Sequence, residues 1–324
     1  MATLYQYSDA GAPALTYTAA VGGLAHFTAF KTVLKACLVS GYSGKDAAGW
    51  ELIAEGASHL VLRPGSHSGY VCFTFGSNTV TIYLAATFLG MNGDVIAGDG
   101  LKTGLSAGNS PPQRIGIMWF ARSASIGSWR VVADDRTMVF VGTGYTQGYY
   151  DMEAGSAGQF IIPLYVGEDS RGNFISIGGA NSTYDGNIFS NGFNPTGMTV
   201  LKDPDTGLLV DANAFSPWVP QISSTRYEER ISAVGGVETL SMIPIGWAKS
   251  GSALSAGFLR GLAQPAELLL LRLSAANAIM GGGAGNNLIG YRSIPLTEGS
   301  YRYFHVGSHF NQQLVLASDN PEFW

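Results

Sequence analysis

The spacing of apolar residues near the start of the chain changes from a helical period to a strand period. Between residues 26 and 40, apolar side chains recur every three or four positions, at Phe27, Phe30, Leu34, Cys37 and Leu38. This spacing gathers them on one face of a helix. Lys31 and Lys35 fall four residues apart on the other face, and Gly41 stands where helices commonly end. The pattern predicts one amphipathic helix over residues 26–40.

After this helix the apolar residues alternate with polar ones in short runs, bounded by Gly, Pro, Asn or Ser. The runs are WELIAEG, HLVLRPG, GYVCFTFG and TVTIYLAATF between residues 50 and 88, then RIGIMWFARS, SWRVVAD and TMVFVGTG between 114 and 144. They predict sequential antiparallel strands joined by hairpins, with Asp134, Asp135 and Arg136 as one hairpin turn. Residues 1–148 are therefore predicted to form an α+β module in which the helix packs on an antiparallel sheet.

Residues 149–324 are predicted to form a β-rich C-terminal domain. QFIIPLYVG and NFISIGG predict strands, and residues 203–207 (DPDTG) have the residues of a tight turn inside a hairpin over 198–212. Residues 227–247 fit either a helix or a strand. Residues 300–324 predict two closing strands, and the terminal aromatics Phe323 and Trp324 indicate a docked chain end. The expected fold class is α+β to mainly β.

Composition changes this picture mainly through its low charge. Charged residues make up 13 % of the chain, about half the usual share. So few charges predict a surface covered by other copies or other proteins. A compact β protein with a Ser, Thr, Asn and Gly surface explains the composition equally well, and the 44 glycines fit its many turns. The net charge of −5 argues against nucleic-acid binding through overall charge.

The chain shows no sequence signal for export or for a membrane span. Its beginning lacks a basic segment followed by an apolar one, and no uncharged apolar run reaches 18 residues. Cys37 and Cys72 are far apart and predict buried, reduced thiols. We therefore expect the chain to fold in a cytosol.

The candidate catalytic and metal-binding residues do not form a known pattern. His305 and His309 are four apart, but their segment alternates like a strand and lacks the Glu of a zinc-protease motif. Two groups of aspartates, Asp203, Asp205 and Asp211, and Asp94 and Asp99, miss the calcium-loop spacing and are explained by turns. The glycine-rich stretch at 281–287 lacks a phosphate-binding lysine. We expect no catalytic residue, metal or cofactor.

Tyrosines form the more suggestive cluster. Tyr145, Tyr149 and Tyr150 lie in a polar, glycine-rich segment, a composition typical of contact surfaces. Packing at a sheet edge explains them as well, and the sequence leaves both interpretations open.

One stretch resembles a module of structural proteins of tailed bacteriophages. It is FKTVLKACLVSGYSGKDAAGWELI (30–53), followed by LVLRPGSHSGYVCFTF (60–75). The matching positions are LKACLV (34–39), Gly41-Tyr42, Lys45 and AAGW (47–50). A looser likeness to the same phage proteins covers GFLRGLAQPAEL (257–268).

The resemblance implies a non-enzymatic virion component of the tail, baseplate or neck. It implies packing against other virion proteins as a homo-oligomer, with Lys31, Lys35 and Lys45 on a solvated or partner-facing side and Trp50 anchoring the following strand. We name Tyr145, Tyr149, Tyr150 and Trp324 as further contact candidates. Three alternatives stay open: a tail protein that binds a host surface or glycan, a capsid decoration protein, and a tail-associated hydrolase with two facing carboxylates.

Overall fold

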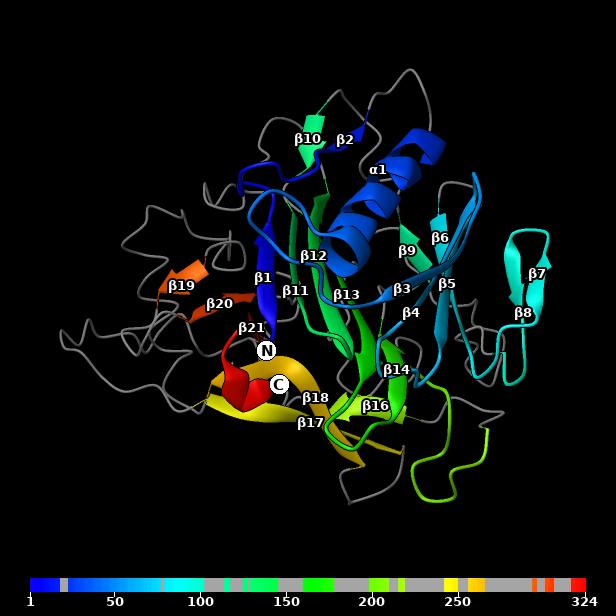
Figure 1. Ribbon diagram of the computed structural model, residues 1–324. Helices are drawn as coiled ribbons and strands as arrows, with labels where there is room; N and C mark the ends of the chain where they lie inside the picture. Colours follow the sequence, from blue (N-terminus) through cyan, green and yellow to red (C-terminus); the bar gives the residue numbers. More distant parts are fainter. Residues whose placement is uncertain are drawn as a thin grey trace.

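The computed structural model shows a central antiparallel sheet that is covered by an N-terminal layer on one face and by a C-terminal sheet on the other (Figure 1). It describes residues 1–17, 23–76, 79–101, 114–116, 125–127, 129–144, 160–177, 198–209, 215–218, 242–249, 256–265, 293–295, 301–305 and 316–324.

The central sheet has six strands in the order β1-β11-β12-β13-β14-β15. Their bounds are Thr3–Gln6, Trp129–Ala133, Thr137–Gly144, Phe160–Glu168, Phe174–Ile177 and Met198–Val200. Both faces of this sheet are covered. In β12, Met138 and Phe140 point into one hydrophobic core, and Val139 and Val141 point into another. Such a sheet needs apolar residues on both sides of each strand, and in β11 Val131 and Val132 point into the two different cores.

The N-terminal layer covers one face of the central sheet. It holds helix α1 (Gly23–Lys35), which continues as a π-helical turn (Ala36–Ser40), and a five-stranded sheet in the order β3-β4-β5-β6-β9. The strands span Glu51–Glu55, His59–Arg63, Tyr70–Gly76, Thr79–Ala85 and Arg114–Gly116. Figure 1 shows α1 between this sheet and the central one, and one core joins all three elements.

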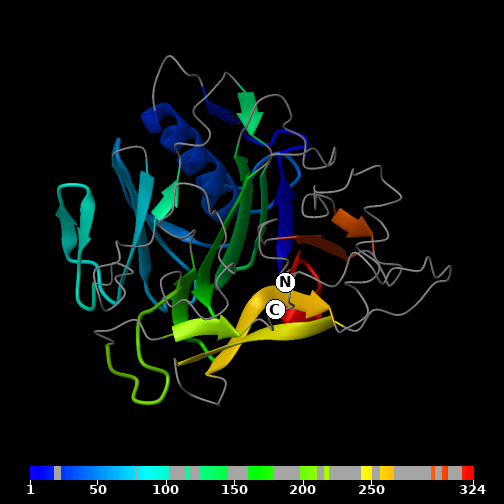
Figure 2. The same cartoon turned by 180° about the vertical axis from the view of Figure 1, so that it is seen from behind.

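The C-terminal sheet covers the other face. Its order is β16-β17-β18-β21-β20-β19, with bounds Phe215–Trp218, Met242–Lys249, Gly257–Pro265, Leu316–Ser318, Arg302–His305 and Ser293–Pro295. A short 3-10 turn, Pro321–Phe323, ends the chain beside β18. The views from the front and from behind both show the two chain ends side by side (Figure 2).

Two small strand pairs complete the described part. β2 (Leu15–Tyr17) pairs with β10 (Ser125–Gly127) near α1. β7 (Gly90–Asn92) and β8 (Val95–Ala97) form a hairpin that stands at the outer side of the N-terminal layer in both views.

The predicted fold class is confirmed: one N-terminal helix and mostly antiparallel sheets. The hairpin series from β3 to β6, the turn at 134–136 and the two closing strands are confirmed as well. Residues 242–247 of the undecided segment belong to strand β17, and residues 227–241 lie outside the described part.

The division between 1–148 and 149–324 stays a prediction. β12 and β13 flank that point and are paired along the whole of β12, so the central sheet contains strands from both sides of it.

Candidate functional site

The residues matched by the resemblance form one folded unit at the end of α1. The last carbonyls of the helix need donors, and the AAGW segment supplies them. Cys37 O accepts from Ala48 N at 2.9 Å, and Leu38 O accepts from Gly49 N at 3.1 Å and Trp50 N at 2.8 Å. Gly41 turns the chain with a φ of +71°, and a Cβ there would lie 2.6 Å from Lys45 O. The AAGW half of the motif therefore supplies the hydrogen-bond donors that the end of its LKACLV half requires.

The indole of Trp50 anchors the next strand, as expected. The side chain is buried in the core between the sheets. Its Nε1 donates to Asp134 O at 2.8 Å, in the β11–β12 turn of the central sheet. Trp50 thus ties the N-terminal layer to the central sheet by packing and by a buried hydrogen bond.

The expectation that Lys31 lies on a solvated or partner-facing side is wrong. Its side chain is 5 % exposed and Nζ donates to Gly56 O at 2.5 Å and Ala57 O at 3.3 Å. Its Nζ also lies 3.3 Å from Glu55 Oε1. The physical reason is the β3–β4 turn, which folds over this face of α1 and offers carbonyls that satisfy a buried ammonium group.

Lys35 and Lys45 also have partners within the chain. Lys35 Nζ lies 2.8 Å from Glu55 Oε2 on the surface. Burial alone would raise the pKa of Glu55, but the hydrogen bond and the charge of Lys35, with a smaller contribution from Lys31, bring it below its ordinary value. Lys45 Nζ donates to Leu4 O at 2.5 Å and lies 3.2 Å from Asp9 Oδ2.

The loop that carries Lys45 covers the free edge of strand β1. Tyr5 OH donates to Asp46 O at 2.7 Å, and Tyr42 OH donates to Asp9 Oδ2 at 2.7 Å. Asp9 Oδ2 also accepts from Gln6 N at 2.9 Å. Outward-facing backbone groups of an edge strand are open to pairing with another chain. Here side chains of the same chain occupy them.

Burial is the main reason that the pKa of Tyr5 is raised to about 12. For Asp9 burial alone would raise the pKa, but the hydrogen bonds from Tyr42, Gln6 and Lys45 bring it below its ordinary value. The edge cover is therefore held by an ionised carboxylate at neutral pH.

The tyrosine candidates Tyr145, Tyr149 and Tyr150 lie outside the described residues.

Trp324 is docked, as predicted for the chain end. Its Nε1 donates to Ser318 O at 2.6 Å, and its ring lies 5.7 Å from the Arg260 guanidinium carbon. Gly261, with a φ of +69°, leaves room for the ring, because a Cβ there would meet it at 2.3 Å.

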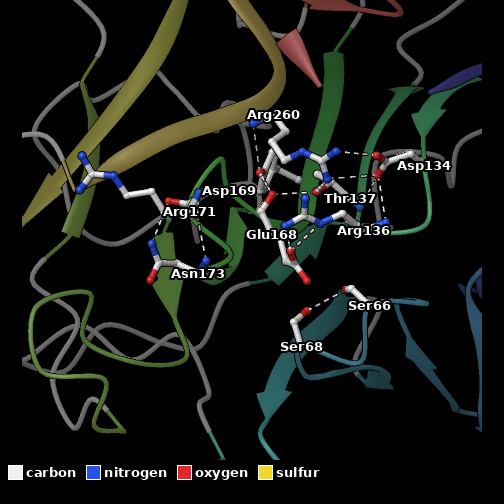
Figure 3. A network of polar contacts seen from close by, with 11 residues as sticks. Ser66, Ser68, Asp134, Arg136, Thr137, Glu168, Asp169, Arg171, Asn173 and Arg260 are labelled. Atoms are coloured by element: carbon white, nitrogen blue, oxygen red, sulfur yellow. Dashed lines mark hydrogen bonds and ion pairs between the residues drawn. The ribbon is translucent and has the colours of Figure 1, made fainter. Parts of the chain in front are cut away.

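A buried polar network joins the central sheet to the C-terminal sheet (Figure 3). Arg260 reaches from β18 to the β11–β12 turn, where Nη2 donates to Asp134 Oδ2 at 2.6 Å and Nη1 to Thr137 Oγ1 at 3.1 Å. Thr137 Oγ1 in turn donates to Glu168 O at 2.7 Å. The Arg136 guanidinium donates to the Glu168 carboxylate, and this pairing raises the pKa of Arg136.

Asp169 is the second centre of this network. Oδ2 accepts from Trp247 Nε1 at 2.8 Å and Asn173 Nδ2 at 3.0 Å, and Oδ1 accepts from the backbone N–H groups of Arg171 and Asn173, each at 2.8 Å. Four donors saturate this fully buried carboxylate. Such a group holds the elements around it together.

The sequence patterns do not predict this network, although one signal for it is present. Arg260 is a single charge inside the apolar run GFLRGLA. A charge in a buried strand requires a partner. The partner, Asp134, is 126 residues away, and the local pattern identifies it only as a turn residue.

The metal candidates are placed as follows. Among the described residues no three His, Cys, Asp or Glu side chains lie close enough to hold an ion. His305 belongs to strand β20, as predicted, and His309 lies outside the described part. Asp203 caps its predicted turn, with Oδ1 accepting from Asp205 N at 2.9 Å and Thr206 N at 3.1 Å.

Several large apolar side chains remain exposed on this chain of few charges. Leu89 is 73 % exposed and Leu208 69 %; Leu24, Leu52, Leu101, Leu209, Ile243, Phe258 and Tyr301 are exposed to between 38 and 43 %. In the described part, no helix has both the length and the apolar character needed to cross a membrane.

Searches for related proteins identified no matching family model and no matching curated protein.

Proposed function

We propose that the chain is a non-enzymatic structural component of a tailed-bacteriophage virion, in the tail, baseplate or neck. It folds in the bacterial cytoplasm and acts by packing against copies of itself and other virion proteins. The observation that carries the proposal is the resemblance over residues 26–75, whose matched positions include core, turn and capping residues of one folded unit.

The charge distribution supports packing through uncharged surface. The three lysines of the resembling stretch make contacts within the chain. Leu89 and Leu208, in contrast, are mostly exposed. Exposed apolar residues in a protein of low charge favour association with other protein surfaces.

The test is the mass of the purified full chain by light scattering across a concentration series. A defined oligomer, or rings and tubes that grow with concentration, is expected. Leu89→Asp and Leu208→Asp, which place charges on the two most exposed leucines, are expected to lower that mass, and Ser66→Asp at an exposed polar position is the control.

A stable monomer at every concentration would contradict self-assembly. It would favour the alternatives of an accessory protein docked on other virion parts or a protein that binds the host surface. A glycan and host-cell binding screen would then separate these two.

A further inference from the structure

The tip of the β7–β8 hairpin presents an Asn-Gly pair to solvent. Asn92 pairs with Val95, so Gly93 and Asp94 form a two-residue turn. Asn92, Gly93 and Asp94 are all exposed. The Asn92 carboxamide makes no hydrogen bond to any described residue. A Cβ built on Gly93 would meet no atom within 4 Å, so nothing crowds the backbone at this point.

This arrangement carries a specific covalent chemistry. The backbone nitrogen of Gly93, once hydroxide has removed its proton, can attack Cγ of Asn92. The N–Cγ bond forms, the Cγ–Nδ2 bond breaks, and Nδ2 takes up a proton and leaves as ammonia. Water then opens the five-membered imide at either carbonyl, which gives aspartate or isoaspartate. Glycine favours the attack because it has no side chain to hinder ring closure.

We propose that Asn92 is a site of spontaneous deamidation, and that docking of the adjacent Asp94 on the N-terminal layer sets its rate. In an extended strand the Gly93 nitrogen and Asn92 Cγ are turned away from each other. The hairpin tip must therefore open before the ring can close. A hairpin of two three-residue strands is held mainly by what it packs against.

Three side chains of the sheet contact the tip, and the longest contact is that of Cys72 Sγ, which donates to Asp94 O at 3.9 Å. His59 Nδ1 lies 2.9 Å from Asp94 Oδ1, and Thr74 Oγ1 donates to Asp94 O at 2.5 Å. The His59 ring is itself fixed against Gly56, where a Cβ would meet it at 2.3 Å. These contacts come from strands β4 and β5, so the clamp joins the tip to the sheet and not to the rest of its own hairpin.

The Asp99–Gly100 pair, which could form the same five-membered imide, is held by contacts that Asn92 and Gly93 lack. Asp99 Oδ2 accepts from Thr87 Oγ1 at 3.0 Å. Leu209 packs over Gly100, where a Cβ would lie 2.4 Å from Leu209 Cδ2. The Asp99 side chain is thus hydrogen-bonded and Gly100 is covered, whereas Gly93 has open space around it.

The product would alter the hairpin. Either product adds a carboxylate two residues from Asp94, and like charges so close repel. Isoaspartate also inserts one more backbone atom into the turn, which displaces Asp94 from His59 and Thr74. Deamidation would therefore release the hairpin tip from the N-terminal layer.

The experiment is a time course of the purified full chain in mildly alkaline buffer made with heavy-oxygen water, followed by peptide mapping. We expect heavy oxygen to enter at residue 92, with both aspartate and isoaspartate formed. Asn191–Gly192, the other Asn-Gly pair of the sequence, is a reference in the same sample. An Asn92 that stays an amide in the native chain, while the urea-unfolded chain converts, would overturn the proposal.

The clamp is tested with His59→Gln and, independently, Thr74→Val. Loss of one hydrogen bond worth about 1 kcal/mol raises the population of the open tip roughly fivefold, and the rate at residue 92 should rise by that factor. Lys249→Gln, which breaks the pair with Asp203 and touches neither Asp94 nor its partners, is the matched control and should leave the rate unchanged. Thermal melts confirm that each variant folds. An unchanged rate in both folded clamp variants would refute control by Asp94.

Discussion

The N-terminal layer and the C-terminal sheet pack on opposite faces of the central sheet, but they are attached in different ways. The N-terminal layer shares one large core with it, in which Phe30 makes edge contacts with Phe73 and Phe140, at centroid distances of 5.9 and 5.2 Å. The C-terminal sheet adds to a second apolar core the buried Arg260–Asp134 ion pair. The first attachment depends on shape, on apolar area and on the neutral hydrogen bond of Trp50, whereas the second also depends on a pairing of charges.

The largest expected effect is loss of aromatic packing in the N-terminal core. Phe30→Ala should lower the free energy of unfolding by about 4 kcal/mol, because it removes a buried ring and leaves a cavity between two sheets and α1. Urea unfolding measures this. Phe258→Ala makes the same chemical change at a side chain that is 42 % exposed, and should cost about 1 kcal/mol or less. Equal losses would contradict the assignment of the core.

Next comes the ion pair of the C-terminal attachment. Arg260→Met should cost about 3 kcal/mol, because Asp134 stays buried without its guanidinium partner. The backbone N–H groups of Arg136 and Thr137 still bind Asp134 and keep the loss at the lower end of the usual range.

The double variant Arg260→Met/Asp134→Asn sharpens this comparison. It removes both charges, so it should be less destabilised than the sum of the single variants, by about 1 kcal/mol or more. Strict additivity in urea unfolding would mean that the two charges do not stabilise each other.

A smaller effect is expected at the docked chain end. Gly261→Ala should cost about 2 kcal/mol, since it combines a left-handed backbone with a clash against the Trp324 ring. Gly207→Ala is the control, because Gly207 has the same φ of +69° and open space around it. Its loss should be about 1 kcal/mol. The difference between the two melting curves isolates the contact with Trp324.

The smallest effect concerns pH. The folded-state pKa of Asp9 is lowered, so its ion pair and hydrogen bonds contribute stability above the unfolded-state pKa near 4, and this is lost as the pH falls through the folded value. The carboxylate is partly solvated, which keeps the contribution under about 1 kcal/mol. Asp9→Asn should flatten this part of the acid-unfolding profile. An unchanged slope would show that Asp9 does not hold the edge cover.

The sequence predicts the helices and strands of this fold better than the long-range contacts between their side chains. The three- and four-residue spacing around Phe30 and the alternation after Trp50 identify α1 and the hairpin series, because each depends on local periodicity. Strand β1, with its four residues, is too short for such a signal. The burial of Lys31 is not visible in the local pattern, because the turn that buries it lies about 25 residues further along the chain. The Arg260–Asp134 pair is hidden for the same reason. The apolar run around Arg260 shows locally that a charge is buried, whereas the identity of its partner depends on the tertiary fold.

The central claim is that the chain assembles through uncharged surface, with the lysines of the resembling stretch engaged inside the fold. The most direct measurement is the light-scattering mass of the full chain at low and at high salt. Salt screens contacts between exposed charges but not apolar burial. We expect an oligomer whose mass is unchanged or larger at high salt. An oligomer that dissociates as salt is added would contradict this claim.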